Sequence, residues 1–163
     1  MNTMQRRIRI LLATLGALGF APIAASQAIY MVIPGVTGPV TTQGFVGAIE
    51  VLSYSQGFTN VKGVVTCSDT SLQKLVDQSS VFFARSVLEQ RGPFNATLYF
   101  TETQPASLVI TTSIKLKSAT VTSVSHGAAS GARISENISM HASSLVVSFN
   151  NNGVMQTYTT DCP

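Results

Sequence analysis

The chain has 163 residues, and 10% of them are charged, against roughly a quarter in an average soluble protein. Its net charge is +3, but three of its ten basic residues, Arg6, Arg7 and Arg9, lie in the first nine positions. Without that segment seven basic and seven acidic residues balance. The remaining chain therefore lacks the positive field that binding to nucleic acid or an anionic membrane requires.

The N-terminal 28 residues are organised like a secretory signal peptide. An apolar run over Ile10–Ala25 follows the arginines, and Ser26 and Ala28 put small residues at positions −3 and −1 of a peptidase site. The alternative is a transmembrane anchor, but a span needs about 20 strongly apolar residues, and this run is shorter. We therefore predict a secreted or periplasmic protein without stable membrane insertion. The Arg6-Arg7 pair leaves twin-arginine export open beside the general route.

Residues 29–163 are enough for one domain with a hydrophobic core and too few for two. Apolar and polar residues mostly alternate, which is the pattern of β-strands. In the first part of this domain we expect a loop over Gly35–Gly44 and strands over Ile29–Ile33, Ala48–Phe58 and Ser71–Val76.

One segment, Ser79–Arg91, has helical periodicity. Either of its first two serines can cap it, and Gly92-Pro93 ends it. Two adjacent aromatic residues, Phe82 and Phe83, are expected to anchor the helix on a sheet. The stripe expected to pack in the core consists of Val81, Ala84, Val87 and Leu88.

Alternation returns after the helix, over residues 94–101 and 108–117. The apolar positions then slip by one place at Ala119 and Val121, which indicates a bulge or a bend. A second slip falls near Ser143-Ser144.

Three further segments complete the pattern: a loop of small residues over Ser125–Gly131, a turn at Asn150–Gly153 and a last strand over Val154–Thr160. Several kinked strands with one helix predict a mainly β fold. We expect a two-sheet antiparallel β-barrel with one flanking α-helix.

The chain has two cysteines, Cys67 and Cys162. Export brings them into a compartment where disulfides persist, and we predict that they form one intrachain bridge. Neither lies in a C-x-x-C motif or near a histidine at ligand spacing, so a metal site is not expected. A bridge at Cys162 would hold the C-terminal tail in place.

Few residues suit catalysis. We place His126 in a loop and His141 on the outward face of a strand, and Ser130 lies one place too late for a nucleophile elbow. Glu136 has the same parity as Ile138, so it is either an inward group, at a site or facing an arginine, or an ordinary residue at a strand edge. The edge position is the simpler interpretation, and we predict no catalytic, cofactor-binding or metal-binding residues.

Five segments have a familiar order along the chain: Ala28–Gly38, Gly47–Gly57, Val76–Ser80, Ile114–Ser125 and Glu136–Met140. Together they resemble the Hcp family, the haemolysin-coregulated tube proteins of type VI secretion. The second segment is similar to the I-E-V-L-S-W-S-x-G strand of that family, with Tyr54 at the aromatic position. The third resembles the V-D-K-x-S entry to its single helix.

The resemblance implies a barrel with a helix on one side, a homo-oligomer that forms hexameric and possibly stacked rings, and no enzymatic activity or cofactor. It also implies secretion-machine or effector partners. The signal peptide, the cysteines and the neutral stretch Thr41–Phe45 depart from the family, so we expect an exported relative. The alternative is a secreted β-barrel binding module or small hydrolase unrelated to type VI secretion. A cleft with His126 or His141 beside an acid would favour that alternative.

We predict that the exported protein starts at Ile29, because Ser26 and Ala28 form the peptidase site. Intact-mass measurement of the exported protein checks this prediction. A membrane-bound species that retains residues 1–28 would contradict it and favour an anchor.

Overall fold

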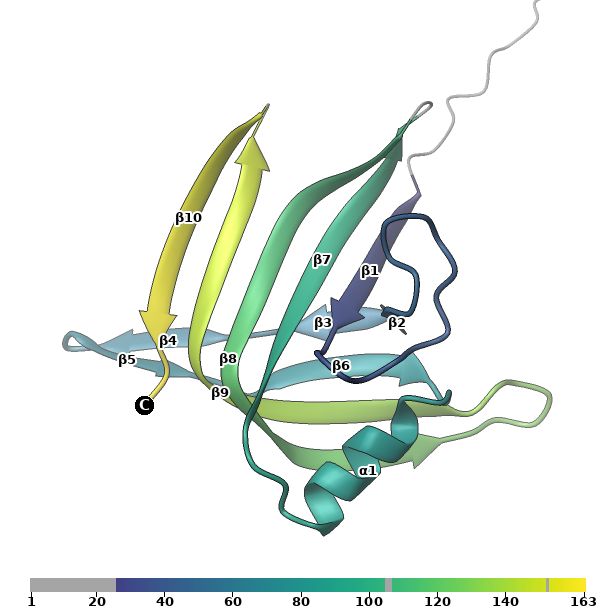
Figure 1. Cartoon of the computed structure of the whole chain (residues 1–163). Helices are drawn as coiled ribbons and strands as arrows, with labels where there is room; N and C mark the ends of the chain where they lie inside the picture. The colour runs from purple at the N-terminus through teal and green to yellow at the C-terminus, as the bar shows by residue number, and fades with distance from the viewer. Residues whose placement is uncertain (1–25, 105–106, 152) are drawn as a thin grey trace, which may run out of the picture.

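The computed structural model describes residues 26–104, 107–151 and 153–163 (Figure 1), so the predicted signal peptide up to residue 25 lies outside the described residues. The elements, in chain order, are β1 (Gln27–Val32), β2 (Ile49–Val51), β3 (Ser53–Ser55), β4 (Phe58–Val61), β5 (Val64–Cys67), β6 (Thr70–Leu75), α1 (Ser80–Leu88), β7 (Phe94–Gln104), β8 (Ser107–Gly127), β9 (Ser135–Asn151) and β10 (Val154–Asp161).

One antiparallel sheet forms a nearly closed barrel. Its strand order is β2-β1-β7-β8-β9-β6-β3, and β10 lies beside the second half of β9. Only Leu52 separates β2 from β3, and its N–H donates to the carbonyl of Gln73 in β6 at 2.7 Å, so the two ends of the sheet meet. The sheet bends so that its upper and lower halves in Figure 1 form two faces, and α1 lies on one side. The predicted mainly β barrel with a flanking helix is confirmed.

The bend in β8 comes from one irregular residue. Leu116 and Ala119 are both fully buried although they are three positions apart, which a regular strand does not allow. Ser118 lies between them with a left-handed φ of 47°, and its N–H donates to Asn95 Oδ1 at 3.2 Å. The register with β7 shifts at the same place. The slip predicted at Ala119 is therefore a β-bulge.

The partner strand β9 changes parity opposite that bulge. Ala142 and Leu145 are both buried, with 5% and 1% of their surfaces exposed. Lys117 pairs with Ser144 and Ala119 with Ala142, so the two strands turn together. The slip predicted near Ser143-Ser144 is confirmed.

The helix buries a different face from the predicted one. Phe83 is fully buried, as expected, and the small side chains of Ser80 and Ser86 lie on the same face, three residues to either side. Val81 and Leu88 are 62% and 82% exposed, so the predicted core stripe is wrong for these two residues. Serine at the contact allows the helix to approach the sheet closely, and hydropathy alone did not indicate this.

The ends of the helix also differ in detail. Ser79 occupies the cap position without a side-chain bond to the backbone, whereas Asp77 Oδ1 accepts hydrogen bonds from the N–H of Ser79 at 2.7 Å and from its hydroxyl at 2.6 Å. The left-handed residue beyond the helix is Gln90, with φ 48°, rather than Gly92.

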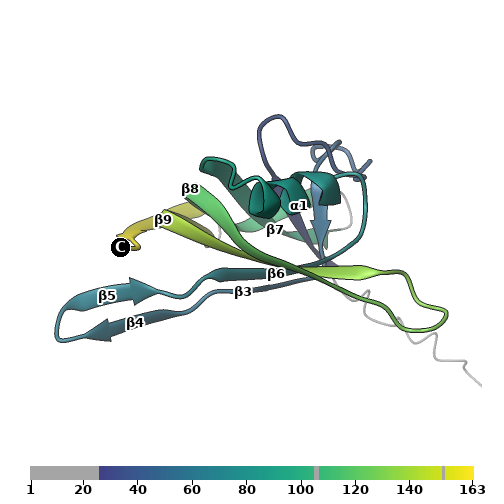
Figure 2. The ribbon, with the colours of Figure 1, turned by 90° about the horizontal axis from the view of Figure 1, so that it is seen from below.

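The predicted strand Ala48–Phe58 is broken in the structure. It becomes β2 and β3, and β4 then starts a hairpin with β5 that the alternation of apolar residues did not predict. Lys62 and Gly63 both have left-handed φ values, of 54° and 85°, which suit a two-residue hairpin turn. The hairpin projects from the barrel on the side where the C-terminus lies (Figures 1 and 2).

We predict that Gly38→Ala destabilises the barrel, while Gly92→Ala does not. A Cβ at Gly38 would collide with the Ala48 carbonyl and lie 2.7 Å from Ile49 Cα, whereas Gly92 has open space. Overpacking of this kind costs about 1–3 kcal/mol. Urea unfolding of both variants measures the difference, and equal midpoints would contradict the prediction.

Candidate functional site

A buried ion pair joins β6 to β9. Lys74 and Glu136 are paired in the ladder, both are fully buried, and Lys74 Nζ lies 2.6 Å from Glu136 Oε1. Glu136 therefore faces inward, and the interpretation of it as an edge residue is wrong. Its partner is a lysine rather than an arginine.

The start of the helix completes this cluster. Lys74 Nζ donates to the Leu75 carbonyl at 2.8 Å and to Ser80 Oγ at 3.1 Å, and it lies 3.1 Å from Asp77 Oδ2. Ser80 Oγ donates in turn to Glu136 Oε1 at 2.6 Å. Buried charges are tolerated when they are paired and hydrogen-bonded, so the ammonium group stabilises the helix start on the sheet.

The second oxygen of Glu136 faces His126. Among the described residues Oε2 has no hydrogen-bond partner, and His126 Nε2 lies 3.5 Å from it. His126 is about half exposed and pairs with Glu136 at the end of β8, so its predicted loop position is wrong.

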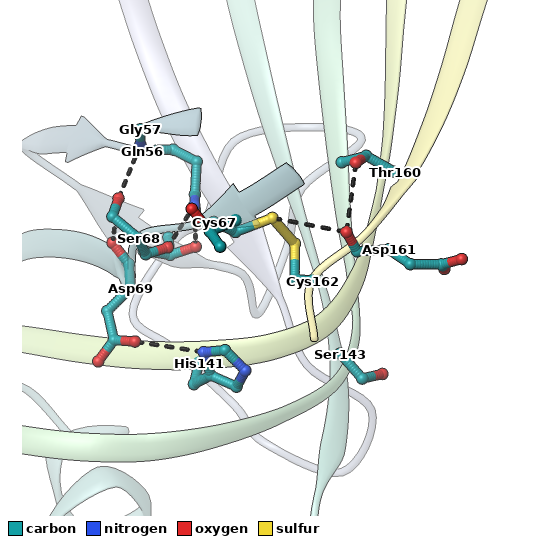
Figure 3. The surroundings of a disulfide bond; sticks show 12 residues. Gln56, Gly57, Cys67, Ser68, Asp69, His141, Ser143, Thr160, Asp161 and Cys162 are labelled. Atoms are coloured by element: carbon teal, nitrogen blue, oxygen red, sulfur yellow. Dashed lines mark hydrogen bonds and ion pairs between the residues drawn. A yellow bond between two sulfur atoms is a disulfide. The ribbon is translucent and has the colours of Figure 1, made fainter. Parts of the chain in front are cut away.

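The other histidine also lies beside an acid. His141 Nδ1 is 3.4 Å from Asp69 Oδ1 (Figure 3), and the hydroxyl of Thr122 donates to Asp69 Oδ2 at 2.5 Å. His141 is partly exposed on β9, in agreement with its predicted outward position. In the part of the chain that the structure describes, no side-chain hydroxyl or thiol is hydrogen-bonded to either histidine.

A cavity of about 630 Å³ opens inside the barrel, lined by Gln27, Ala28, Ile29, Glu50, Val51, Leu52, Tyr54, Phe100, Thr101, Thr111, Thr112 and Ile114. The rings of Tyr54 and Phe100 meet edge to face at 5.3 Å. Burial, with a smaller effect of Tyr158, raises the pKa of Tyr54 above its usual range, so its hydroxyl stays protonated. The lining contains no histidine, lysine or cysteine, and Glu50 is its one carboxylate.

The two cysteines form a disulfide (Figure 3). Cys67 is the last residue of β5, Cys162 follows β10 directly, and their Cα atoms are 5.2 Å apart. The bridge closes a separation of 95 residues. In the chain-entropy model a loop of that length stabilises the fold by about 4–5 kcal/mol, as an upper figure.

Other kinds of site find no support within residues 26–104, 107–151 and 153–163. No three His, Cys, Asp or Glu side chains there are grouped to hold a metal ion. No helix in these ranges is long and apolar enough to cross a membrane.

The family model for the type VI secretion system effector, Hcp, matches residues 30–150. The chain belongs to this family. No curated protein sequence matches it. The resemblance inferred from the five sequence segments is thus confirmed, and the family to which it points is that of a structural tube protein.

Solved structures share the fold at low sequence identity. Hcp1 from Salmonella typhimurium superposes with a TM-score of 0.75 at 16% identity, over 83% of this chain and 94% of that one. A type VI secretion system effector from Yersinia pestis superposes with a TM-score of 0.72 at 16% identity, over 82% of this chain and 98% of that one. The secreted protein Hcp3 from Pseudomonas aeruginosa superposes with a TM-score of 0.70 at 12% identity, over 85% of this chain and 99% of that one.

One feature of the sequence indicates the buried cluster: the spacing of Lys74 relative to the buried residues of β6. Thr70, Leu72 and Lys74 alternate on a single face of β6, and all three are buried. A lysine with the parity of a buried leucine predicts an acidic partner on the neighbouring strand.

We predict that Lys74→Met strongly destabilises the protein, because it leaves Glu136 buried and unpaired, at a cost of about 3–5 kcal/mol. The double variant Lys74→Met/Glu136→Leu should recover most of the loss. Urea unfolding measures both. The matched control is Arg85→Met, which breaks an exposed pair with Glu89 and should leave the midpoint nearly unchanged. A double variant as unstable as the single one would contradict the pairing argument.

Proposed function

We propose that the protein is a non-enzymatic structural subunit that assembles into hexameric, possibly stacked, rings after export from the cytoplasm. The observation that carries this proposal is the match of the Hcp family model to residues 30–150, on a barrel with the same fold as solved Hcp proteins. The family resemblance implies rings and tubes, with secretion-machine or effector proteins as further partners.

The surface of the molecule supports association. β10 pairs with β9 on one side, and no other strand that the structure describes pairs with its second edge. A free strand edge presents unpaired backbone groups to a partner chain. Large apolar side chains are also exposed on β10 and on the β4–β5 hairpin: Val154, Met155, Tyr158, Phe58, Val61 and Val64. Identical subunits that meet head to tail close into a ring when the rotation fits.

The alternative of a small hydrolase has less support. His126 and His141 do lie beside acids, but neither lines the cavity in the barrel. A histidine–carboxylate pair needs a nucleophile and a substrate cleft within reach to act as a catalytic set. The geometry of the described residues therefore favours the structural role.

Export is supported by the predicted signal peptide and by the disulfide, since such bonds persist in oxidising compartments. The structure adds a consequence for the processing site. β1 starts at Gln27, which pairs with Glu102, and Ala28 pairs with Thr101. Cleavage after Ala28 would remove these two pairs and leave Ile29–Val32 as the first strand of the mature chain.

We predict that the purified mature chain has the mass of several subunits, most simply six, by light scattering, and forms annular particles in electron microscopy. Because few charges lie on the surface, the mass should change little between low and high salt. A strictly monomeric protein over a wide concentration range would overturn the ring proposal and favour a binding module.

A further inference from the structure

Two elements at the edge of the barrel, the β4–β5 hairpin and β10, are held mainly by backbone ladders and have exposed side chains. The hairpin strands β4 and β5 pair with each other, and no other strand in the described ranges pairs with either. All four residues of β4 are exposed, as are the first six of β10. Both elements therefore depend on backbone ladders at one edge and bury little apolar surface, which are the features of segments that open locally.

The base of the hairpin has a few local hydrogen bonds. Ser68 Oγ accepts from the N–H of Gly57 at 2.8 Å, and the N–H of Ser68 donates to the Gly57 carbonyl at 2.9 Å (Figure 3). The side chain of Gln56 donates to the Ser68 carbonyl at 2.5 Å. These bonds fix where the hairpin leaves the barrel, but they do not reach β10.

The disulfide joins these two elements to each other. Cys67 ends the hairpin, and Cys162 directly follows β10 (Figure 3). Cys162 is 3% exposed, and its N–H donates to the Ser143 carbonyl of β9 at 2.8 Å, so the bond fastens the hairpin to the barrel wall through the C-terminus.

We infer that the Cys67–Cys162 bond is a compartment-dependent fastening: the reduced chain forms the barrel but holds the hairpin and β10 loosely, and oxidation after export fixes both. The barrel strands β7, β8 and β9 keep their ladders and their buried core in either state. The further consequence, that rings assemble only from the oxidised protein, rests on the proposed function.

The oxidation requires an external disulfide of a protein or small-molecule oxidant. The Cys67 thiol loses its proton, and its sulfur attacks the oxidant, forming a mixed disulfide and releasing one thiol of the oxidant. Cys162 then loses its proton and attacks the Cys67 sulfur, which forms the internal bond and releases the second thiol. Two electrons and two protons pass from the cysteines to the oxidant. Cys67 is the more exposed of the two and is the natural first attacker.

Hydrogen exchange measured by mass spectrometry tests the fastening. The oxidised mature protein is compared with Cys67→Ala/Cys162→Ala and with wild type reduced by a phosphine, which loses no side-chain atoms and so controls for packing. In both forms without the disulfide, the open forms, the amides of residues 58–67 and 154–161 should exchange about tenfold faster or more than in the oxidised protein. The exchange rates of β7 and α1 should not change. Identical rates in all three samples, or a uniform rise that includes β7 and α1, would overturn the inference.

Light scattering on the same three samples tests the link to assembly. A ring-sized mass in the oxidised protein and a smaller mass in both open forms is the expected result. A ring-sized mass in every form would overturn the dependence of assembly on oxidation and leave the ring proposal intact. A monomer in every form, oxidised protein included, would overturn the ring proposal, while the exchange data would still decide the fastening.

Discussion

The barrel depends on β8 and β9 bending at the same place. These strands form the longest ladder of the sheet, and each contributes side chains to both faces of the fold. A change of parity in one strand alone would turn its apolar residues outward beyond the bend. Because the bulge at Ser118 lies opposite the parity change near Ser143, the apolar residues on both sides of the bend stay buried: Leu116, Ala119, Ala142 and Leu145. This shared bend brings the two ends of the sheet together, where β2 pairs with β1 and β3 pairs with β6.

The buried charge cluster fixes the helix on that framework. The ion pair of Lys74 and Glu136 joins two neighbouring strands, and Ser80, in the first turn of the helix, is hydrogen-bonded to both residues. Such a pair contributes less to net stability than to geometry, because desolvating two ions consumes much of their attraction. The cluster therefore serves mainly to position α1 on the sheet.

The sequence predicted the fold class, the barrel, the helix and both parity slips, because alternation and Gly-Pro punctuation are local signals. It failed where tertiary packing decided the outcome. Val81 and Leu88 are apolar by type but face outward, since the small Ser80 and Ser86 allow closer contact with the sheet. The parity of Glu136 with Ile138 allowed an inward position, but its partner Lys74 lies 62 residues away, where a local pattern does not reach. Gly63 is a turn signal for the hairpin of β4 and β5, but apolar and polar residues do not alternate clearly on either side of it.

The separation of 95 residues between Cys67 and Cys162 has a consequence for the order of events during biosynthesis. A chain synthesised from its N-terminus contains Cys67 long before Cys162 is added. The bond therefore closes only after β6, the helix and β7 to β10, which lie between the two cysteines, have been made. A chain that stops between β10 and Cys162 would contain every strand of the barrel and still leave Cys67 without its partner.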